Sequence, residues 1–186
     1  MSGLLCGIGY NSRREHSNKI KAYEKWYNMF YRCYNKKLQE KYPTYIGCSV
    51  DYQWDDYQDF ADWYTIHDIY DLRYELDKDL LVKNNKIYSP ETCCLLPKAL
   101  NLLILDTPAS RGSYPRGVSF NKVSNKCVAS LSLNGISKTL GMFDCPEEAS
   151  AAYVQAKETH VKKMAKRWEQ KIDTKAYAAL MNWTVY

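Results

Sequence analysis

The sequence predicts an α+β protein with a helical N-terminal part and a C-terminal part in which three antiparallel strands pack on one helix. Aromatic residues recur every three or four positions in two segments before residue 68, which is the period of one helix face. Three short runs with the composition of strands follow after residue 115. Between these parts, "DTPASRGS" has almost no apolar side chain, which is typical of a linker.

Composition restricts the class of protein. Hydrophobic residues make up 46% and charged residues 25% of the 186 residues, as in a globular chain. The first apolar stretch is too short for a signal peptide and no run is long enough to span a membrane, so we expect a cytosolic protein without a membrane partner. Seven cysteines form no CxxC pair, and their odd number argues against a disulfide framework.

The net charge of +5 is unevenly distributed along the chain. Residues 1–45 carry +6, residues 46–107 carry −7 and residues 108–172 carry +6. This pattern suits a surface that faces nucleic-acid phosphates, beside an acidic centre that either binds metal or is simply solvated.

Two helices are expected in the N-terminal part. Residues 19–39 place aromatic residues on one face, and their basic residues form either a solvated face or a phosphate contact. Residues 51–67 repeat the helical period, with aspartates mostly off the apolar stripe. These aspartates are Asp55, Asp56, Asp59 and Asp62. We interpret them as a solvated face that also stabilises the helix N-terminus, in preference to a metal cluster.

The predicted strands are residues 116–121, 126–133 and 136–143, and Asn134-Gly135 is a strong signal for a two-residue hairpin. They predict an antiparallel sheet of three strands, which needs a cover on one face to be stable.

A long helix follows this sheet. Asp144 is its expected N-cap and Pro146 lies in its first turn. Small side chains on its apolar stripe would let it lie close on the sheet. The expected stripe consists of Ala149, Ala152, Tyr153, Ala156, His160 and Met164.

The C-terminal part has three short matches to a known pattern: Arg116-Gly117-Val118, Leu140-Gly141-x-Phe143, and a helix that begins with Glu-Glu-Ala. From residue 114 to about residue 160 the chain resembles the plant ethylene-response-factor (APETALA-type) DNA-binding domain. The resemblance implies a sheet that enters the major groove of double-stranded DNA.

The same resemblance implies the residues that would contact DNA. Plant members carry Arg and Trp on the outward face of the sheet, whereas this chain has short hydroxyl and amide side chains, so we expect low sequence specificity. The expected base contacts are Ser119, Asn121, Ser130, Ser132, Ser137 and Thr139. The expected phosphate contacts are Arg116, Lys122, Lys126 and Lys138.

The N-terminal part contains "LDKDL" and "YSPETC", in order and spacing similar to those of HNH-type (homing-like) endonucleases of phage genomes. This resemblance covers residues 20–101. It implies a degenerate ββα-metal (HNH/His-Me) finger, two strands and a helix that hold one Mg²⁺ or Mn²⁺ ion. Asp77 would be the metal-binding carboxylate, Thr92 replaces the loop-ordering Asn, and Asn101 would be the second ligand.

The general base of such a finger is a histidine, because an imidazole is largely neutral near pH 7 and accepts a proton. Lys78 occupies this position and would act as an acid or a phosphate clamp. Three alternatives remain for catalysis: Asp79 accepts the proton, His67 reaches in from upstream, or the metal alone lowers the pKa of water. The structural alternatives are a turn carboxylate for Asp79 and a helix C-terminal residue for His67.

These expectations combine into one hypothesis. An HNH-like nuclease domain spans residues 1–106, a linker 107–113, an APETALA-type domain 114–172 and a tail 173–186. The protein would be a phage-type DNA endonuclease acting in the cytoplasm of a bacterial host. The alternative is a catalytically inactive protein that binds DNA or a host protein. The sequence leaves the oligomeric state open.

Overall fold

The structure is a computed structural model, and contacts within it divide the chain into two units. Unit 1 comprises residues 1–101 and 168–179, and unit 2 comprises residues 102–167 and 180–186. Apart from Ser113, the predicted linker of residues 107–113 lies outside the described residues. The described residues are 4–12, 20–68, 74–105, 113–133 and 135–185.

An aromatic core stabilises unit 1. The apolar faces of α1 (Ile20–Tyr34) and α3 (Tyr57–His67) meet there. The indole nitrogen of Trp26 donates a hydrogen bond of 2.8 Å to the carbonyl oxygen of Trp54, so the polar edge of one buried ring is satisfied. Large buried rings dominate this core, among them Trp26, Phe30, Trp54, Tyr57 and Phe60.

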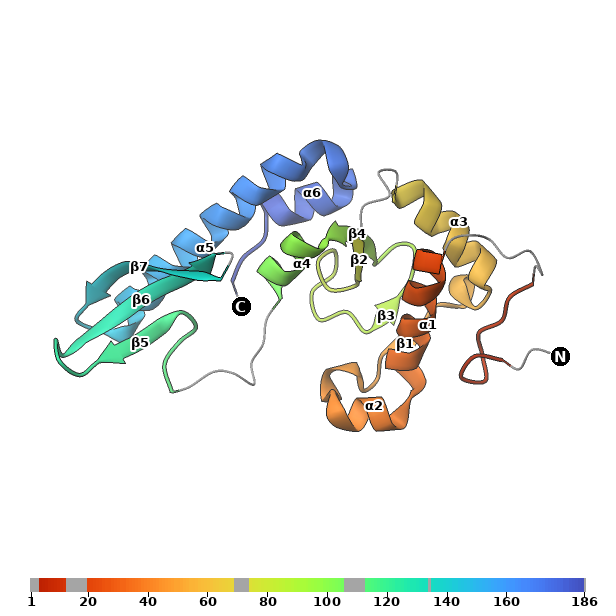
Figure 1. Cartoon of the computed structure of the whole chain (residues 1–186), viewed down its shortest axis with the longest axis horizontal. Coiled ribbons are helices and arrows are strands. Elements are labelled where there is room, and N and C mark those ends of the chain that lie inside the picture. Colours follow the sequence, from red (N-terminus) through yellow and green to blue (C-terminus); the bar gives the residue numbers. More distant parts are fainter. Residues whose placement is uncertain (1–3, 13–19, 69–73, 106–112, 134, 186) are drawn as a thin grey trace. The chain divides into compact units, whose positions relative to one another are not determined.

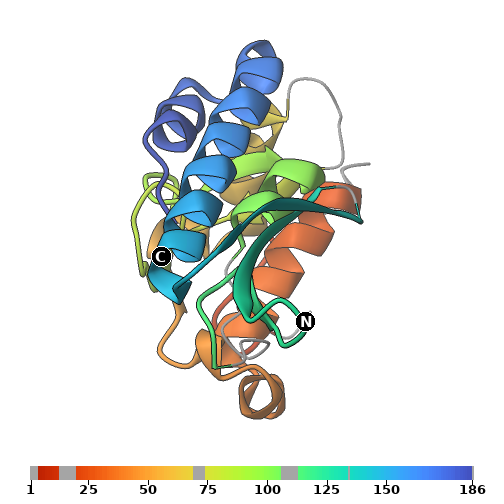
Figure 2. The same ribbon diagram turned by 90° about the vertical axis from the view of Figure 1, so that its left-hand side faces the viewer.

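The single helix expected for residues 19–39 is in fact two helices, α1 and α2 (Lys36–Lys41). The side chain of Asn35 accepts a hydrogen bond of 2.9 Å from the amide of Leu38, which is an N-cap contact and begins a new helix. The chain changes direction between the two helices (Figure 2).

Short strands form two small sheets in unit 1. β1 (Ser49–Val50) runs parallel to β3 (Ile87–Tyr88), and β2 (Tyr74–Asp77) runs antiparallel to β4 (Cys94–Pro97). β4 leads directly into α4 (Lys98–Ile104). Two 3-10 turns, η1 (Pro43–Tyr45) and η2 (Tyr52–Trp54), connect the earlier elements.

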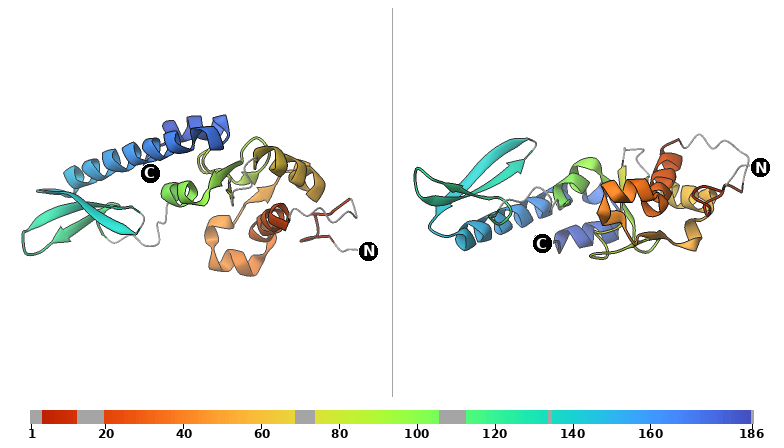
Figure 3. Two further views of the ribbon diagram at one scale, coloured as in Figure 1. Left: turned by 45° about the horizontal axis from the view of Figure 1, so that its top comes forward. Right: turned by 90° about the horizontal axis from the view of Figure 1, so that it is seen from below.

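Unit 2 confirms the predicted sheet of three antiparallel strands on one helix. β5 (Val118–Asn121), β6 (Lys126–Leu133) and β7 (Ile136–Phe143) follow in this order, and α5 (Pro146–Trp168) lies along one face (Figure 1). Leu133 pairs with Ile136, as the predicted two-residue hairpin requires. Figure 3 shows no other described element of unit 2 on the opposite face of the sheet.

Small side chains allow α5 to approach the sheet closely. Cys127 and Ala129 of β6 and Ala149 of α5 form the buried centre of this core. The alanine and tyrosine at the start of the predicted stripe, Ala149 and Tyr153, are buried as expected.

The prediction is wrong for the second half of the buried stripe on α5. In the structure the stripe continues through Lys157, Val161 and Ala165. The predicted residues Ala156, His160 and Met164 are only half-buried. The helix also has a second neighbour within unit 2, since the amide of Val185 donates a hydrogen bond of 3.1 Å to the carboxylate of Glu158. Its later turns therefore face the C-terminal segment as well as the sheet.

The sequence predicts a tail for residues 173–186, but most of this segment is a helix. After the 3-10 turn η4 (Glu169–Lys171) it forms α6 (Thr174–Met181), in which Ala176 and Leu180 are fully buried. Burial of these apolar side chains stabilises the helix, which is too short to be stable by itself.

Candidate functional site

Asp77 lies at the end of β2, where its carboxylate orders the loop that follows. Its Oδ1 atom accepts hydrogen bonds of 2.8 Å from the amide of Asp79 and 2.7 Å from the amide of Leu80. Only 8% of the residue is exposed. Burial raises the pKa of the Asp77 carboxyl above its ordinary value, and the two backbone hydrogen bonds lower it in part.

Lys78, at the position of the expected general base, is a buried cross-link of the same loop. Its ammonium group donates hydrogen bonds of 2.6 Å to Oδ1 of Asp79 and 2.7 Å to the carbonyl oxygen of Asn85. It also lies 5.9 Å from the centre of the Tyr88 ring, where a cation is favoured. Two of the catalytic candidates, Lys78 and Asp79, are thus bonded to each other.

Thr92 and Asn85 order the remainder of the loop. The hydroxyl of Thr92 donates a hydrogen bond of 2.7 Å to the carbonyl oxygen of Ile87 and lies 3.0 Å from the hydroxyl of Ser89. The side-chain Nδ2 atom of Asn85 donates a hydrogen bond of 2.9 Å to the carbonyl oxygen of Lys78. Sequence reasoning missed Asn85, because "KNNK" predicts a turn without indicating which of its side chains returns to the strand.

His67 is at the end of α3, and its contacts differ from those of a base next to Asp77. Its Nδ1 atom donates to the carbonyl oxygen of Trp63 at 2.7 Å, and its ring stacks on the Trp63 ring with centroids 4.4 Å apart. Its Nε2 atom lies 3.9 Å from Oδ2 of Asp173. The helix C-terminal role is therefore the one that these contacts support.

Asp173 is a second acidic group of this region that the sequence did not indicate. Burial is the main cause that raises the pKa of the Cys94 thiol, and the negative charges of Asp77 and Asp173 add to it. Both carboxylates therefore lie within electrostatic range of the same thiol. Because Asp173 belongs to the segment expected as a tail, no local pattern could have placed it here.

Asn101 is on α4, and its Oδ1 atom is buried without a hydrogen-bond partner. A buried acceptor that lacks a donor is unfavourable unless an ion or water satisfies it. This atom and the Asp77 carboxylate are oxygen ligands of the kind that Mg²⁺ prefers. Among the described residues, however, no group of three His, Cys, Asp or Glu side chains gathers to hold a metal.

The sheet of unit 2 has one face that its own helix leaves exposed, here named the outer face. Strand register defines its members: Ser119 pairs with Val128 and Val128 with Met142, while Ser130 pairs with Thr139 and Ser132 with Ser137. Partners directly opposite each other point to the same side of a sheet. Asn121 pairs with Lys126 and follows the same alternation. The outer face therefore consists of Ser119, Asn121, Lys126, Val128, Ser130, Ser132, Ser137, Thr139 and Met142.

The basic residues expected to contact phosphates are mostly engaged with protein groups or directed to the helix side of the sheet. Arg116 donates a hydrogen bond of 2.9 Å to the carbonyl oxygen of Leu105, and Lys126 forms an ion pair with Asp144. Lys138 pairs across the sheet with the buried Leu131, so it lies on the helix-facing side.

Asn121 and Lys122 lie at the β5–β6 turn. Oδ1 of Asn121 accepts hydrogen bonds from the amides of Val123 at 2.9 Å and Ser124 at 3.2 Å, which closes the turn. Lys122 is exposed there. Lys122 is therefore open to a ligand, whereas Lys126 lies on the outer face in an ion pair with Asp144.

In comparisons with known proteins, no family model matches the chain, and no curated protein or solved structure is similar enough to count as a match. None of the helices in the described part of the chain is long and apolar enough to cross a membrane.

Proposed function

We propose that this is a phage-type DNA-binding protein and that the outer face of unit 2 enters the major groove of double-stranded DNA. The observation that carries the proposal is the outer face itself, a sheet surface of short side chains that no other described element of unit 2 covers. The major groove is wide enough for a two-stranded ribbon such as β6 and β7. Short side chains let such a ribbon approach base edges closely.

The composition of the outer face supports weak discrimination between sequences. Serine and threonine hydroxyls both donate and accept hydrogen bonds, so they tolerate several base edges. Val128 and Met142 form an apolar pair at one end, which suits contact with thymine methyl groups. We expect affinities that vary little between unrelated duplexes.

The test is DNA binding by variants that place a negative charge on or off the outer face. Ser132→Glu adds a carboxylate to the exposed sheet, where it would oppose DNA phosphates, and we expect binding to weaken about tenfold or more. Ala178→Glu adds the same charge at an exposed position of α6, which is not part of the sheet, and should leave binding near that of the wild type. Fluorescence anisotropy with a labelled duplex measures both. Equal affinity of the two variants would overturn the assignment to the outer face.

A second candidate function is metal-dependent hydrolysis of the DNA phosphodiester, and the unpartnered Oδ1 atom of Asn101 favours it. Asp77 and Asn101 would hold Mg²⁺ or Mn²⁺, since Mg²⁺ commonly uses one or two carboxylates and keeps several waters. When bound, such an ion lowers the pKa of water and neutralises charge on the phosphate. The engaged ammonium of Lys78 supplies no base, so DNA binding is the function that the site supports best.

Nicking of supercoiled plasmid with Mg²⁺ or Mn²⁺, with EDTA as control, tests the second candidate. Asp77→Asn is preferable to Asp77→Ala, because the amide oxygen still accepts the bonds from the loop amides. Asp59→Asn, an exposed aspartate of α3, is the matched control. Metal-dependent nicking that is lost in Asp77→Asn and kept in Asp59→Asn would establish a nuclease. Tight DNA binding without nicking would leave β2, β4 and α4 as a structural scaffold.

A further inference from the structure

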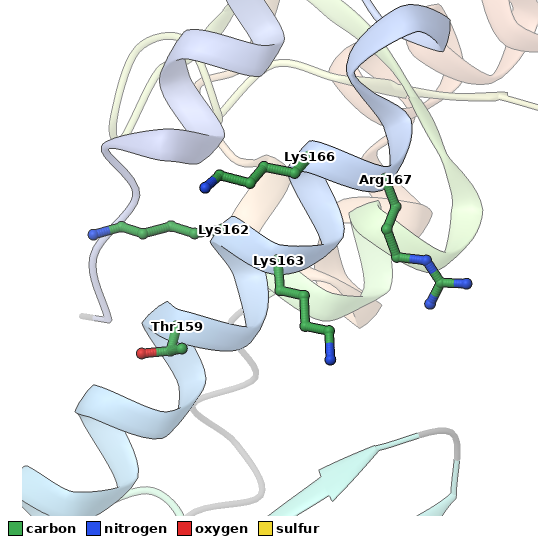
Figure 4. A pocket seen from close by; sticks show the side chains of 5 residues that line it. All are labelled: Thr159, Lys162, Lys163, Lys166 and Arg167. Carbon is green, nitrogen blue, oxygen red and sulfur yellow. The ribbon is translucent and has the colours of Figure 1, made fainter.

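The C-terminal half of α5 carries four cations on one side of the helix. Thr159, Lys162, Lys163, Lys166 and Arg167 are spaced by three and one residues, which places them on a single helical face around an open hollow (Figure 4). This set of residues is named the basic face. Within the basic face, Lys162 and Lys166 point to one flank of the helix and Lys163 and Arg167 to the other (Figure 4). The opposite side of the helix is the buried stripe that includes Val161 and Ala165.

Acidic side chains are missing from this stretch of α5. Residues 159–167 contain four Lys or Arg and no Asp or Glu. Among the described residues, no ion pair involves Lys162, Lys163 or Lys166, and the guanidinium of Arg167 contacts the sulfur of Met164. Glu158, one position before the basic face, accepts a hydrogen bond from the amide of Val185.

The surplus positive charge affects a neighbouring titratable group. Burial lowers the pKa of His160, and the charges of Lys157 and Lys163 lower it further. Since Lys157 points to the buried side of the helix and Lys163 to the exposed side, the imidazole lies between two cations. A site with uncompensated cations on both sides of a histidine attracts anions.

Helix stability does not explain the arrangement. Lys162 and Lys166, and likewise Lys163 and Arg167, are like charges at positions i and i+4, which oppose helix formation. Cations in the last turn favour the helix dipole, and this accounts for Lys166 and Arg167. It does not account for Lys162 and Lys163, which lie one turn earlier. An anionic ligand would account for all four.

We infer that the basic face of α5 binds the phosphate backbone of double-stranded DNA. The inference rests on the proposed DNA-binding function. Because Arg116 and Lys126 are engaged and Lys138 points toward the helix, the strands alone offer few free cations to phosphates. Phosphate contacts by Lys and Arg provide most of the affinity of a weakly specific DNA-binding protein. Four cations within about 7.5 Å of helix axis match the dense charge of a duplex.

The experiment compares two triple variants of the full chain with the same change in net charge. One replaces the basic face, Lys162→Gln, Lys163→Gln and Lys166→Gln. The other replaces exposed lysines of α2, Lys36→Gln, Lys37→Gln and Lys41→Gln. Affinity for a labelled duplex is measured by anisotropy between about 50 and 200 mM salt. Glutamine is a good helix former, and circular dichroism verifies that both variants are folded.

We expect the basic-face variant to bind about tenfold more weakly or worse, and its logarithmic salt slope to fall by up to about 2.7, or 0.9 per lost phosphate contact. The α2 variant should keep most of the wild-type slope. A basic-face variant that binds like the α2 variant, with Ser132→Glu still defective, would overturn this inference and leave the proposed function standing.

Two other outcomes separate the inference from its premise. If the basic-face variant loses binding while Ser132→Glu does not, the basic face is the DNA-binding surface and the outer face is not. If the wild type binds no duplex but sediments with vesicles of anionic lipid, both the proposed function and this inference are overturned.

Discussion

Gly117 immediately precedes β5 and lies against Tyr153 of α5, and its replacement by alanine provides a sharp test of unit 2. Gly117 has φ of +73°, in the left-handed region that side chains disfavour. A Cβ atom there would lie 2.0 Å from Cδ2 and 2.4 Å from Cε2 of the buried Tyr153 ring. The carbonyl oxygen of Gly117 also accepts a hydrogen bond of 2.8 Å from the amide of Ser130.

The expected loss of stability has two parts. Alanine in the left-handed region costs about 1–2 kcal/mol, and overpacking against a buried ring adds about 1–3 kcal/mol. Gly135→Ala is the matched control, because Gly135 has φ of +80° but a Cβ atom at this position would meet no described atom within 4 Å. We therefore expect a loss of about 2–5 kcal/mol for Gly117→Ala and only the first part for Gly135→Ala.

Hydrogen exchange of the β6 amides in the full chain measures this loss locally, without assuming that both units unfold together. Exchange at Ser130 should accelerate far more in Gly117→Ala than in Gly135→Ala. Adding Tyr153→Leu should rescue part of the Gly117→Ala effect, because the flexible leucine side chain can move away from the methyl group. Equal protection of Ser130 in the two alanine variants would refute the close contact.

Further predictions concern charge and the ordered loop. Burial and the charge of Arg116 lower the pKa of Lys157 to about 8 from 10.5, so the wild type should gain stability as the pH rises between these values. Lys157→Met should remove this gain in thermal melts. Asp77→Ala should be less stable than Asp77→Asn by about 1–3 kcal/mol in urea, since it leaves two loop amides without an acceptor. EDTA should not change the melting temperature, because protein groups order the loop.

Local patterns predicted much of the fold. The bounds of β6 and β7 agree with the predicted runs, because alternation and the Asn-Gly turn fix both register and ends. Asp56 accepts a hydrogen bond of 3.0 Å from the amide of Gln58 at the start of α3, as expected for an aspartate at a helix N-terminus. The break at Asn35 also had a local signal, an N-cap residue, but the continuous aromatic period concealed it.

What the sequence did not predict depends on contacts between distant segments. The contact of α5 with the C-terminal segment joins Val185 to Glu158, 27 positions earlier, and no local pattern indicates it. The side to which Lys138 points depends on its pairing with Leu131, and the irregular register between Ala129 and Ser130 is not visible in the sequence. Asp173 and His67 are about a hundred residues apart in the chain, so their proximity has no local signal.

Hydrogen bonds between protein groups order the loop between β2 and β4. In a metal finger, an ion would help to hold such a loop. Here the Asp77 carboxylate accepts hydrogen bonds from the amides of Asp79 and Leu80. The side chains of Lys78 and Asn85 each donate to the other's carbonyl oxygen. The hydroxyl of Thr92 donates to the carbonyl oxygen of Ile87. Lys78 is thus a structural element of the loop. Because this order does not depend on an ion, a folded loop is no evidence of catalysis, and DNA binding and nicking must be measured separately.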